Sequence, residues 1–283
     1  MAPARLRLPS MAPMSDFEPV HAYETVNLER DGATARIELN VPERMNAWGA
    51  QLTADLLDAF ARVREDDELR AVLLTGAGRG FCSGADLSAG FDPTPEGHPD
   101  LLRSLRERYH PVILGIRALP KPVVAAVNGG AVGVGCSLAL ACDLVLAAES
   151  AYFLLAFVNI GLVPDGGSSA FIPSRVGLAR AAEMAMLGER VPAAQALEWG
   201  LVNAVHPDDE LPGAAAALAA RLAAGPTLSY AGAKRQFNAW CYPGLEDQLE
   251  LEAQIQQEQA RSADFAEGVT AFLQKRPATF TGR

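Results

Sequence analysis

Short strand-like segments alternate with helix-like segments through the first two thirds of this chain. Residues 71–75 and 122–127 are apolar runs next to Gly or Pro, which is typical of buried strands. Residues 143–147 predict a third strand, and residues 136–142 predict a short helix before it. Residues 52–63 predict a longer helix, whose apolar face consists of Leu52, Leu56, Leu57, Phe60 and Val63. This alternation indicates right-handed crossovers between parallel strands and therefore an α/β core.

Two further segments belong to this core. Residues 25–28 and 34–39 alternate in polarity around an Asp-Gly pair, which predicts a β-hairpin. Residues 101–119 are mostly helical in pattern, and we expect a kink at Pro111 because proline cannot donate the backbone hydrogen bond.

The strand pattern ends near Asp208. Residues 212–224 are rich in Ala and Leu and predict a helix, and residues 244–261 predict a polar amphipathic helix with Leu249, Leu251 and Ile255 on its apolar side. Ser262 is expected to cap a last helix, which carries Phe265, Val269, Phe272 and Leu273. A tail of this kind has little core of its own, so we expect it to mediate homo-oligomerisation.

The chain is therefore divided into three parts. Residues 1–20 contain four prolines and lack the apolar run of a secretory signal, which predicts a disordered leader. Residues 21–207 form the predicted α/β core, and residues 208–283 form the predicted C-terminal helical region. The true start of the chain is expected at Met1, Met11 or Met14.

Charge and composition narrow the partners. Asp and Glu outnumber Lys and Arg by 34 to 24, which gives a net charge of −10. A surface of this sign repels nucleic acid and anionic lipid, so we expect neither as a partner. An unbroken apolar run of about 18 residues is lacking, which predicts no membrane span. The four histidines are scattered and the four cysteines form no CxxC pair, which predicts no metal site and free thiols in a reducing, cytoplasmic location.

Two glycine-rich segments carry the chemistry. Residues 76–87 follow a strand and contain four glycines in nine residues, and residues 125–140 run from a strand through a glycine-rich turn into a helix. Glycine lets the backbone approach a ligand, and the start of a helix offers N–H groups without intrahelical partners. Two such junctions on adjacent strands could form an oxyanion hole. The alternative is two structural tight turns that pack side by side.

At these two segments the chain resembles a known family. The sequences FCSGADL (residues 81–87) and AAVNGGAVGVGCSLALACDLVLA (residues 125–147) resemble the signature segments of the crotonase, or enoyl-CoA hydratase/isomerase, superfamily. Other matches follow in order from about residue 22 to residue 283. The resemblance implies a crotonase-like spiral of βαβ units (the ClpP/crotonase fold), with a C-terminal helical oligomerisation region that forms a trimer or a dimer of trimers. The turn GLVPD (residues 161–165) and the end of the chain (residues 261–276) are most similar to the ring-epoxyphenylacetyl-CoA isomerase branch.

The resemblance also implies site residues. It places the oxyanion-hole donors at the backbone N–H groups of Ala85 and Val134, and the substrate is an acyl-CoA thioester that carries its own coenzyme A, so no bound cofactor is expected. Basic side chains should meet the CoA phosphates; the candidates are Arg44, Arg79, Lys275 and Arg276, the last two from a neighbouring subunit. The substrate-binding residues implied are Arg44, Ala47, Ser83, Gly84, Asp86, Leu87, Ser88, Gly133, Ser137, Phe157 and Lys275.

The acid–base residues distinguish the possible reactions. Hydratases of this superfamily use two glutamates, which would fall on Ser137 and Phe157, so neither carboxylate is present. Ser137 could instead bind a polar acyl group or cap a helix. Asp165 remains, and it resembles the single acid of the isomerases, which removes an α-proton and returns it two carbons away. The alternatives are that Asp165 merely belongs to a Pro-Asp-Gly turn, that displaced acids make the protein a hydratase, or that it binds acyl-CoA without catalysis.

Overall fold

The computed structural model describes residues 17–283, so Met1, Met11, Met14 and most of the predicted leader lie outside the described residues. Strand β1 (Glu18–Ala22) begins inside the segment predicted as leader and pairs with β2. Strand β1 therefore spans the predicted boundary at residue 20.

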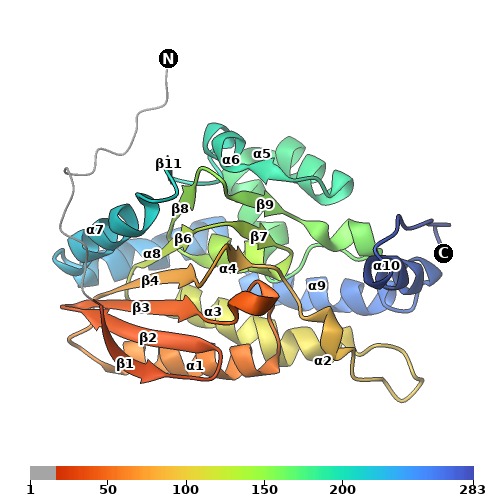
Figure 1. Cartoon of the computed structure of the whole chain (residues 1–283), viewed down its shortest axis with the longest axis horizontal. Coiled ribbons are helices and arrows are strands. Elements are labelled where there is room, and N and C mark those ends of the chain that lie inside the picture. Colours follow the sequence, from red (N-terminus) through yellow and green to blue (C-terminus); the bar gives the residue numbers. More distant parts are fainter. Residues whose placement is uncertain (1–16) are drawn as a thin grey trace.

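A seven-stranded sheet forms the centre of the molecule (Figure 1). Its strand order is β1-β2-β3-β4-β6-β8-β11. The strands from β3 onward are parallel, and β1, β2 and β3 are antiparallel neighbours. The strand bounds are β2 (Val26–Asp31), β3 (Thr34–Leu39), β4 (Ala71–Gly76), β6 (Val123–Val127), β8 (Leu144–Ala148) and β11 (Ala204–His206).

A second, four-stranded sheet lies beside the first and has the order β10-β9-β7-β5. Its members are β5 (Gly80–Cys82), β7 (Gly130–Val132), β9 (Tyr152–Leu154) and β10 (Val191–Pro192). Strands β4, β6 and β8 of the large sheet are each followed at once by one short strand of the small sheet. The chain therefore winds as a spiral, and each turn brings a strand end and a glycine-rich junction to the same place.

Helices cover this spiral. The bounds are α1 (Ala50–Glu65), α2 (Leu101–Ser104), α3 (His110–Ala118), α4 (Val134–Ala141), α5 (Ser168–Leu187), α6 (Ala193–Trp199), α7 (Leu211–Ala223), α8 (Thr227–Cys241), α9 (Leu245–Gln259) and α10 (Ala263–Leu273). Strands β4 and β6 are almost wholly buried, as expected for parallel strands covered by helices. None of the helices between residues 17 and 283 combines the length and apolarity that a bilayer crossing needs.

The hairpin, the α/β alternation and the Ser262 cap are confirmed. Strands β2 and β3 pair from Val26 with Leu39 to Asp31 with Thr34, and the Ser262 side chain accepts a hydrogen bond from the N–H of Phe265. Residues 101–118 form one continuous helical stretch, in which a π-helical turn, η3 (Leu105–Tyr109), lies directly before Pro111. Prolines and π-helical turns are both common causes of a helix kink, so the kink at Pro111 stays a prediction.

Two predicted apolar faces are corrected. In α1, Leu57 is 36% exposed while Leu56 is fully buried. In α9, Leu251 is exposed, and the buried face carries Glu252, Gln256 and Gln257 beside Leu249. Polar side chains can occupy a buried helix face where hydrogen-bond partners meet them, and the turn before α5 supplies such partners for α9.

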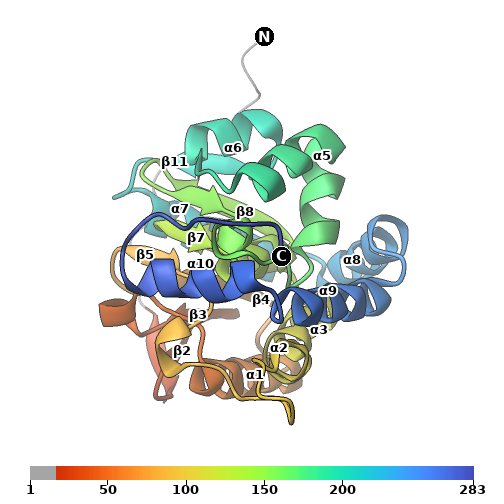
Figure 2. The ribbon, with the colours of Figure 1, turned by 90° about the vertical axis from the view of Figure 1, so that its right-hand side faces the viewer.

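The C-terminal helices pack mainly on their own core. Helix α7 lies against β4 and β6, α9 against α2 and α5, and α10 against the 3-10 turn η4 (Ala156–Ile160). Figure 2 shows α10 and the C-terminal segment lying across one end of the molecule. Helix α8 exposes three large apolar side chains, Leu228, Phe237 and Trp240, and α10 also exposes Phe272 and Leu273.

Adjacent leucines of α1 test the corrected helix face. Replacing Leu56 with Ala opens a cavity in the core and should lower the free energy of unfolding by about 2–5 kcal/mol. Replacing Leu57 with Ala should lower it by less than about 1 kcal/mol, since the side chain is partly in water. Urea unfolding followed by circular dichroism measures both. Equal losses for the two variants would contradict this packing.

Candidate active site

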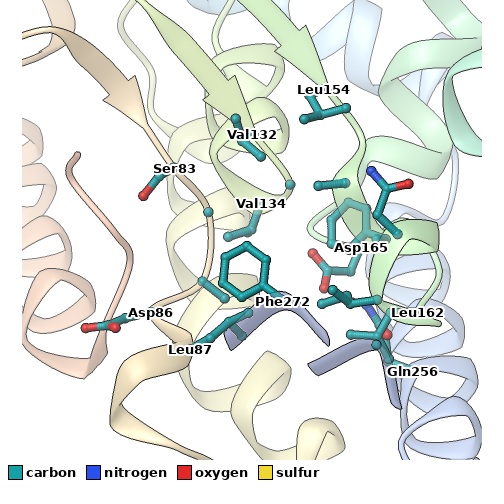
Figure 3. Close-up of a pocket in the computed structure, with 18 of the residues that line it drawn as sticks. Ser83, Asp86, Leu87, Val132, Val134, Leu154, Leu162, Asp165, Gln256 and Phe272 are labelled. Carbon is teal, nitrogen blue, oxygen red and sulfur yellow. The ribbon is translucent and has the colours of Figure 1, made fainter. Parts of the chain in front are cut away.

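A cavity of about 700 Å³ opens where the glycine-rich junctions, the turn before α5 and the C-terminal helices meet (Figure 3). Most of its wall is apolar, with Leu105, Tyr109, Phe157, Leu162 and Phe272 among the lining side chains. Asp165 is the one acidic side chain among the described lining residues besides Asp86 at the rim. The cavity therefore combines an apolar volume with a single deep carboxyl group.

The N–H of Ala85 is turned toward this cavity by the pairing of its neighbours. The segment around Ala85 forms a short parallel bridge with Trp48. The N–H of Trp48 donates to the carbonyl of Gly84 (2.7 Å), and the N–H of Asp86 donates to the carbonyl of Trp48 (3.2 Å). In this parallel bridge, the carbonyl of Gly84 and the N–H of Asp86 lie on the edge of the segment that faces Trp48. The N–H of Ala85, which lies between them, is on the opposite edge. Among the described residues, that N–H has no backbone acceptor.

The N–H of Val134 is free because Val134 is the first residue of α4. The first N–H groups of a helix have no intrahelical acceptor and carry the positive end of the helix dipole. Gly133 precedes it with φ 54° and ψ −128°, a conformation that favours glycine, and its own N–H donates to the carbonyl of Leu154 (2.8 Å). This hydrogen bond fixes the direction in which the helix starts.

The two junctions touch each other. A Cβ atom placed on Gly84 would lie 2.8 Å from the carbonyl oxygen of Val132 and 3.8 Å from the Cα of Gly133. Ala85 and Val134, the residues that follow each glycine, both line the cavity. Two residues whose N–H groups have no backbone acceptor in the described part of the chain therefore line the same cavity, an arrangement suited to binding one oxygen that carries negative charge.

Asn46 holds the first junction in place, and the sequence did not single it out. Its side-chain nitrogen points at the carbonyl oxygens of Gly80 (2.9 Å), Ala77 (3.0 Å) and Phe81 (3.2 Å), and its side-chain oxygen accepts from the N–H of Val41 (2.9 Å). The side chain is fully buried. It thereby satisfies loop carbonyls that the strands leave unpaired.

The carboxyl group of Asp165 is buried and unequally paired. Its Oδ2 accepts a hydrogen bond from Nε2 of Gln256 (2.8 Å), whereas Oδ1 is buried and finds no hydrogen-bond partner in the part of the chain that the structure describes. The backbone carbonyl of the same residue accepts from the hydroxyls of Ser137 (2.7 Å) and Ser168 (2.8 Å). Burial, reinforced by the negative charge of Glu252 and opposed by the Gln256 hydrogen bond, holds the pKa of Asp165 well above its usual value.

Glu252 is a second buried carboxyl group, but its oxygens are already occupied. They accept from the N–H groups of Gly167 (2.8 Å) and Ser169 (3.1 Å) and from the Ser169 hydroxyl. Glu252 thus satisfies donors at the N-terminus of α5. Burial raises its pKa to about 7, against the lowering effect of these hydrogen bonds.

Ten of the residues implied by the family resemblance line the cavity. They are Ser83, Gly84, Ala85, Asp86, Leu87, Gly133, Val134, Phe157, Asp165 and Arg276. Six others lie outside the lining, namely Arg44, Ala47, Arg79, Ser88, Ser137 and Lys275. Ala85, Val134 and Asp165 therefore line one cavity, whereas only some of the residues expected along the CoA arm line it.

The rim and buried residues have different partners from those expected. Asp86 points away from Asp165 in Figure 3 and forms an ion pair with Arg44 (2.7 Å) while accepting from the N–H of Ser88 (3.0 Å). Ser137 lies inside α4, where it supports the Asp165 turn and caps no helix. Lys275 is exposed beyond α10.

Other lining residues were not assigned a role from the sequence. Gln256, Arg108 and Arg190 belong to the cavity wall. Gln256 comes from helix α9, far along the chain, so spacing alone gives no signal for it. Arg190 lies over the ring of Tyr152, 4.4 Å from its centroid, and this contact also crosses about 40 residues.

Comparison with known proteins gives a consistent family. The model of the enoyl-CoA hydratase/isomerase family matches residues 29–283. A probable enoyl-CoA hydratase of Rhodobacter capsulatus is 46% identical over 262 residues, covering 93% of this chain and 100% of that protein. The 1,2-epoxyphenylacetyl-CoA isomerase of Escherichia coli is 44% identical over 248 residues, covering 87% of this chain and 94% of that protein. The crystal structure of an enoyl-CoA hydratase from Mycobacterium avium subsp. paratuberculosis superimposes with a TM-score of 0.83 at 40% identity, covering 92% of this chain and 100% of that one.

The raised pKa of Glu252 predicts a pH-dependent stability. Between its ordinary value of 4.5 and its folded value of about 7, the folded protein binds more protons than the unfolded chain, so stability should fall as pH rises through this window. The shift corresponds to at most about 3 kcal/mol. Glu252→Gln stays neutral and should lose most of this slope.

Urea unfolding at a series of pH values from 4.5 to 8 measures the effect. The variant should gain stability relative to the wild type as pH rises. A constant difference between the two proteins at every pH would contradict a titrating Glu252.

Proposed function

Because the chain belongs to the enoyl-CoA hydratase/isomerase family and has its crotonase fold, we propose that this acyl-CoA enzyme is an isomerase with one acid–base residue, Asp165. The N–H groups of Ala85 and Val134 hold the thioester oxygen. The observation that carries the proposal is that Asp165, whose buried Oδ1 has no partner among the described residues, lines the same cavity as Ala85 and Val134. One carboxyl group is enough for a reaction that moves a proton within the substrate.

The proposed steps follow from this geometry. The thioester carbonyl accepts hydrogen bonds from both N–H groups, which makes its α-proton more acidic. Asp165 removes that proton, and the negative charge that develops on the oxygen is stabilised by the two donors, each typically contributing about 3–4 kcal/mol. Protonated Asp165 then returns the proton two carbons away. Its raised pKa makes the carboxylate a stronger base than an exposed aspartate.

Two observations favour isomerisation over hydration. The positions that correspond to the hydratase glutamates hold Phe157, an apolar part of the cavity wall, and Ser137, which lies outside it. Glu252 could supply a displaced second acid, but both its oxygens accept hydrogen bonds from the start of α5 and it does not line the cavity. A hydratase needs an acid and a base that reach water and substrate together, so hydration is the second candidate.

The acyl group is proposed to be apolar and bulky. The cavity volume of about 700 Å³ and the side chains of Tyr109, Phe157 and Phe272 suit an unsaturated chain or a ring. The similarity to the Escherichia coli 1,2-epoxyphenylacetyl-CoA isomerase supports a ring-epoxide substrate as one possibility and a 3-enoyl-CoA as the other.

The assembly is proposed to be a trimer or a dimer of trimers. The apolar side chains that α8 exposes, Leu228, Phe237 and Trp240, support a subunit contact there. In such an assembly Lys275 could contact the CoA phosphates of a neighbouring subunit. Cytoplasmic location stays a prediction.

Replacing Asp165 with Asn tests the proposed base. The variant keeps the shape of the side chain but cannot take a proton, so kcat for double-bond migration should fall by about 100- to 10,000-fold. The affinity for an acyl-CoA ester should change by less than about twofold, because the N–H groups remain. Asp209→Asn, an equal charge change on the exposed surface, is the control. Wild-type turnover by the Asp165→Asn protein would rule out this role.

Crotonyl-CoA separates the three possible activities. The isomerase account predicts that the conjugated double bond of this ester persists, while a panel of 3-enoyl-CoA and ring-epoxide esters is converted. Ultraviolet absorbance and mass spectrometry follow both reactions. Addition of water at a rate similar to isomerisation would favour a hydratase, and tight binding without conversion of any ester would favour a non-catalytic acyl-CoA-binding protein.

A further inference from the structure

Helix α9 presents a polar stripe to the turn that carries Asp165. Gln248, Glu252 and Gln256 are spaced by four residues and so lie on one face of the helix. Nε2 of Gln248 donates to the hydroxyl of Ser169 (2.8 Å), Glu252 accepts from the start of α5, and Gln256 reaches Asp165 itself. This stripe replaces the apolar face that a buried helix usually shows.

The orientation of the Gln256 amide is fixed by its surroundings. Nε2 donates both to the carbonyl oxygen of Val163 (2.8 Å) and to Oδ2 of Asp165 (2.8 Å). A backbone carbonyl can only accept, so the amide nitrogen and not the amide oxygen must face Val163. The same nitrogen then faces Asp165. Gln256 is 1% exposed and lines the cavity, which leaves it little freedom to rotate.

This arrangement makes the two oxygens of Asp165 inequivalent. A proton on Oδ2 would point at the N–H of Gln256 and break that hydrogen bond, whereas Oδ1 has no donor next to it. The proton of the neutral acid therefore belongs on Oδ1. In the ionised form, Oδ2 stays bonded to Gln256 and Oδ1 carries the lone pair that can take a proton.

We propose that Gln256 is a positioning residue, which fixes the Asp165 carboxyl group so that Oδ1 alone takes and returns the substrate proton. The inference rests on the proposed function, in which Asp165 is the base. Gln256 of α9, which lies 91 residues after Asp165 in the sequence, thereby selects the reactive oxygen.

Several groups set the charge around Asp165. Burial and, after it, Glu252 on the same helix raise the pKa of Asp165, and the Gln256 hydrogen bond lowers it. Burial and, after it, Asp165 raise the pKa of Tyr109 on η3. The cations of the cavity wall are Arg108, Arg190 and Arg276. Because a base acts in its ionised form, kcat/KM should rise with pH through the pKa of Asp165. Loss of the Gln256 donor should move this rise to higher pH, and loss of the Glu252 charge should move it to lower pH.

The experiment compares pH profiles of kcat/KM for three variants of the full-length protein. Gln256→Met keeps the length of the side chain without its donor, and should shift the midpoint upward by about one pH unit with about a tenfold loss of kcat at neutral pH. Glu252→Gln should shift the midpoint downward. Gln254→Met, on the exposed face of α9, should match the wild type. A loss of activity in Gln256→Met with an unmoved midpoint would overturn the inference.

A second measurement does not depend on the folding of a variant. In the wild-type protein, the NMR signals of the Gln256 side-chain NH₂ group should titrate with the same midpoint as kcat/KM, whereas those of Gln254 should not. Absence of that titration would contradict the proposal. The proposed function would fail by a different result. Full activity of Asp165→Asn would show that Asp165 is not the base. An inactive Asp165→Asn together with an unshifted pH profile of Gln256→Met would contradict only the positioning role of Gln256.

Discussion

The proposed chemistry depends on two backbone N–H groups that have no backbone acceptor among residues 17–283. The N–H of Ala85 lies on the free edge of a short bridge, and the N–H of Val134 starts a helix. Ala85 follows Gly84 and Val134 follows Gly133, and the two glycine segments are in close contact. A Cβ atom on Gly84 would lie 2.8 Å from the Val132 carbonyl oxygen. The spiral of paired strands brings these junctions together, because every turn returns a strand end to the same edge. A cavity with two unpaired donors and apolar walls stabilises an oxyanion far better than water would.

Opposing effects act on the pKa of Asp165, the carboxyl group of the cavity. Burial and Glu252 favour the neutral form of Asp165, and the hydrogen bond from Gln256 favours the ionised form. The serine hydroxyls on its backbone carbonyl hold the turn in place. The net effect is a pKa of Asp165 well above its ordinary value, which suits the proposed role as a base because its carboxylate binds a proton more strongly than an exposed aspartate does.

The sequence predicted the parts of the site that depend on local pattern. Glycine-rich junctions after strands are short-range signals, and they indicated where an oxyanion hole could form. The family resemblance placed its donors at Ala85 and Val134 and the acid at Asp165, and all three residues line one cavity. The hairpin and the helix cap at Ser262 were predictable for the same reason. Gln256 and Glu252 were not, because their partners lie more than 80 residues away and glutamate and glutamine at helical spacing usually mark a solvated face. Ser137 was misassigned since its buried partner, the Asp165 carbonyl, also lies far along the chain.

The central claim is that one thioester oxygen accepts hydrogen bonds from both N–H groups. Isotope-edited infrared spectroscopy of a ¹³C-labelled acyl-CoA bound to the Asp165→Asn protein tests it most directly, because the ester cannot turn over through the proposed base. The account predicts that the carbonyl stretch shifts to clearly lower frequency than in water, as two strong donors polarise the bond. A frequency at or above that of the free ester in water would contradict the account.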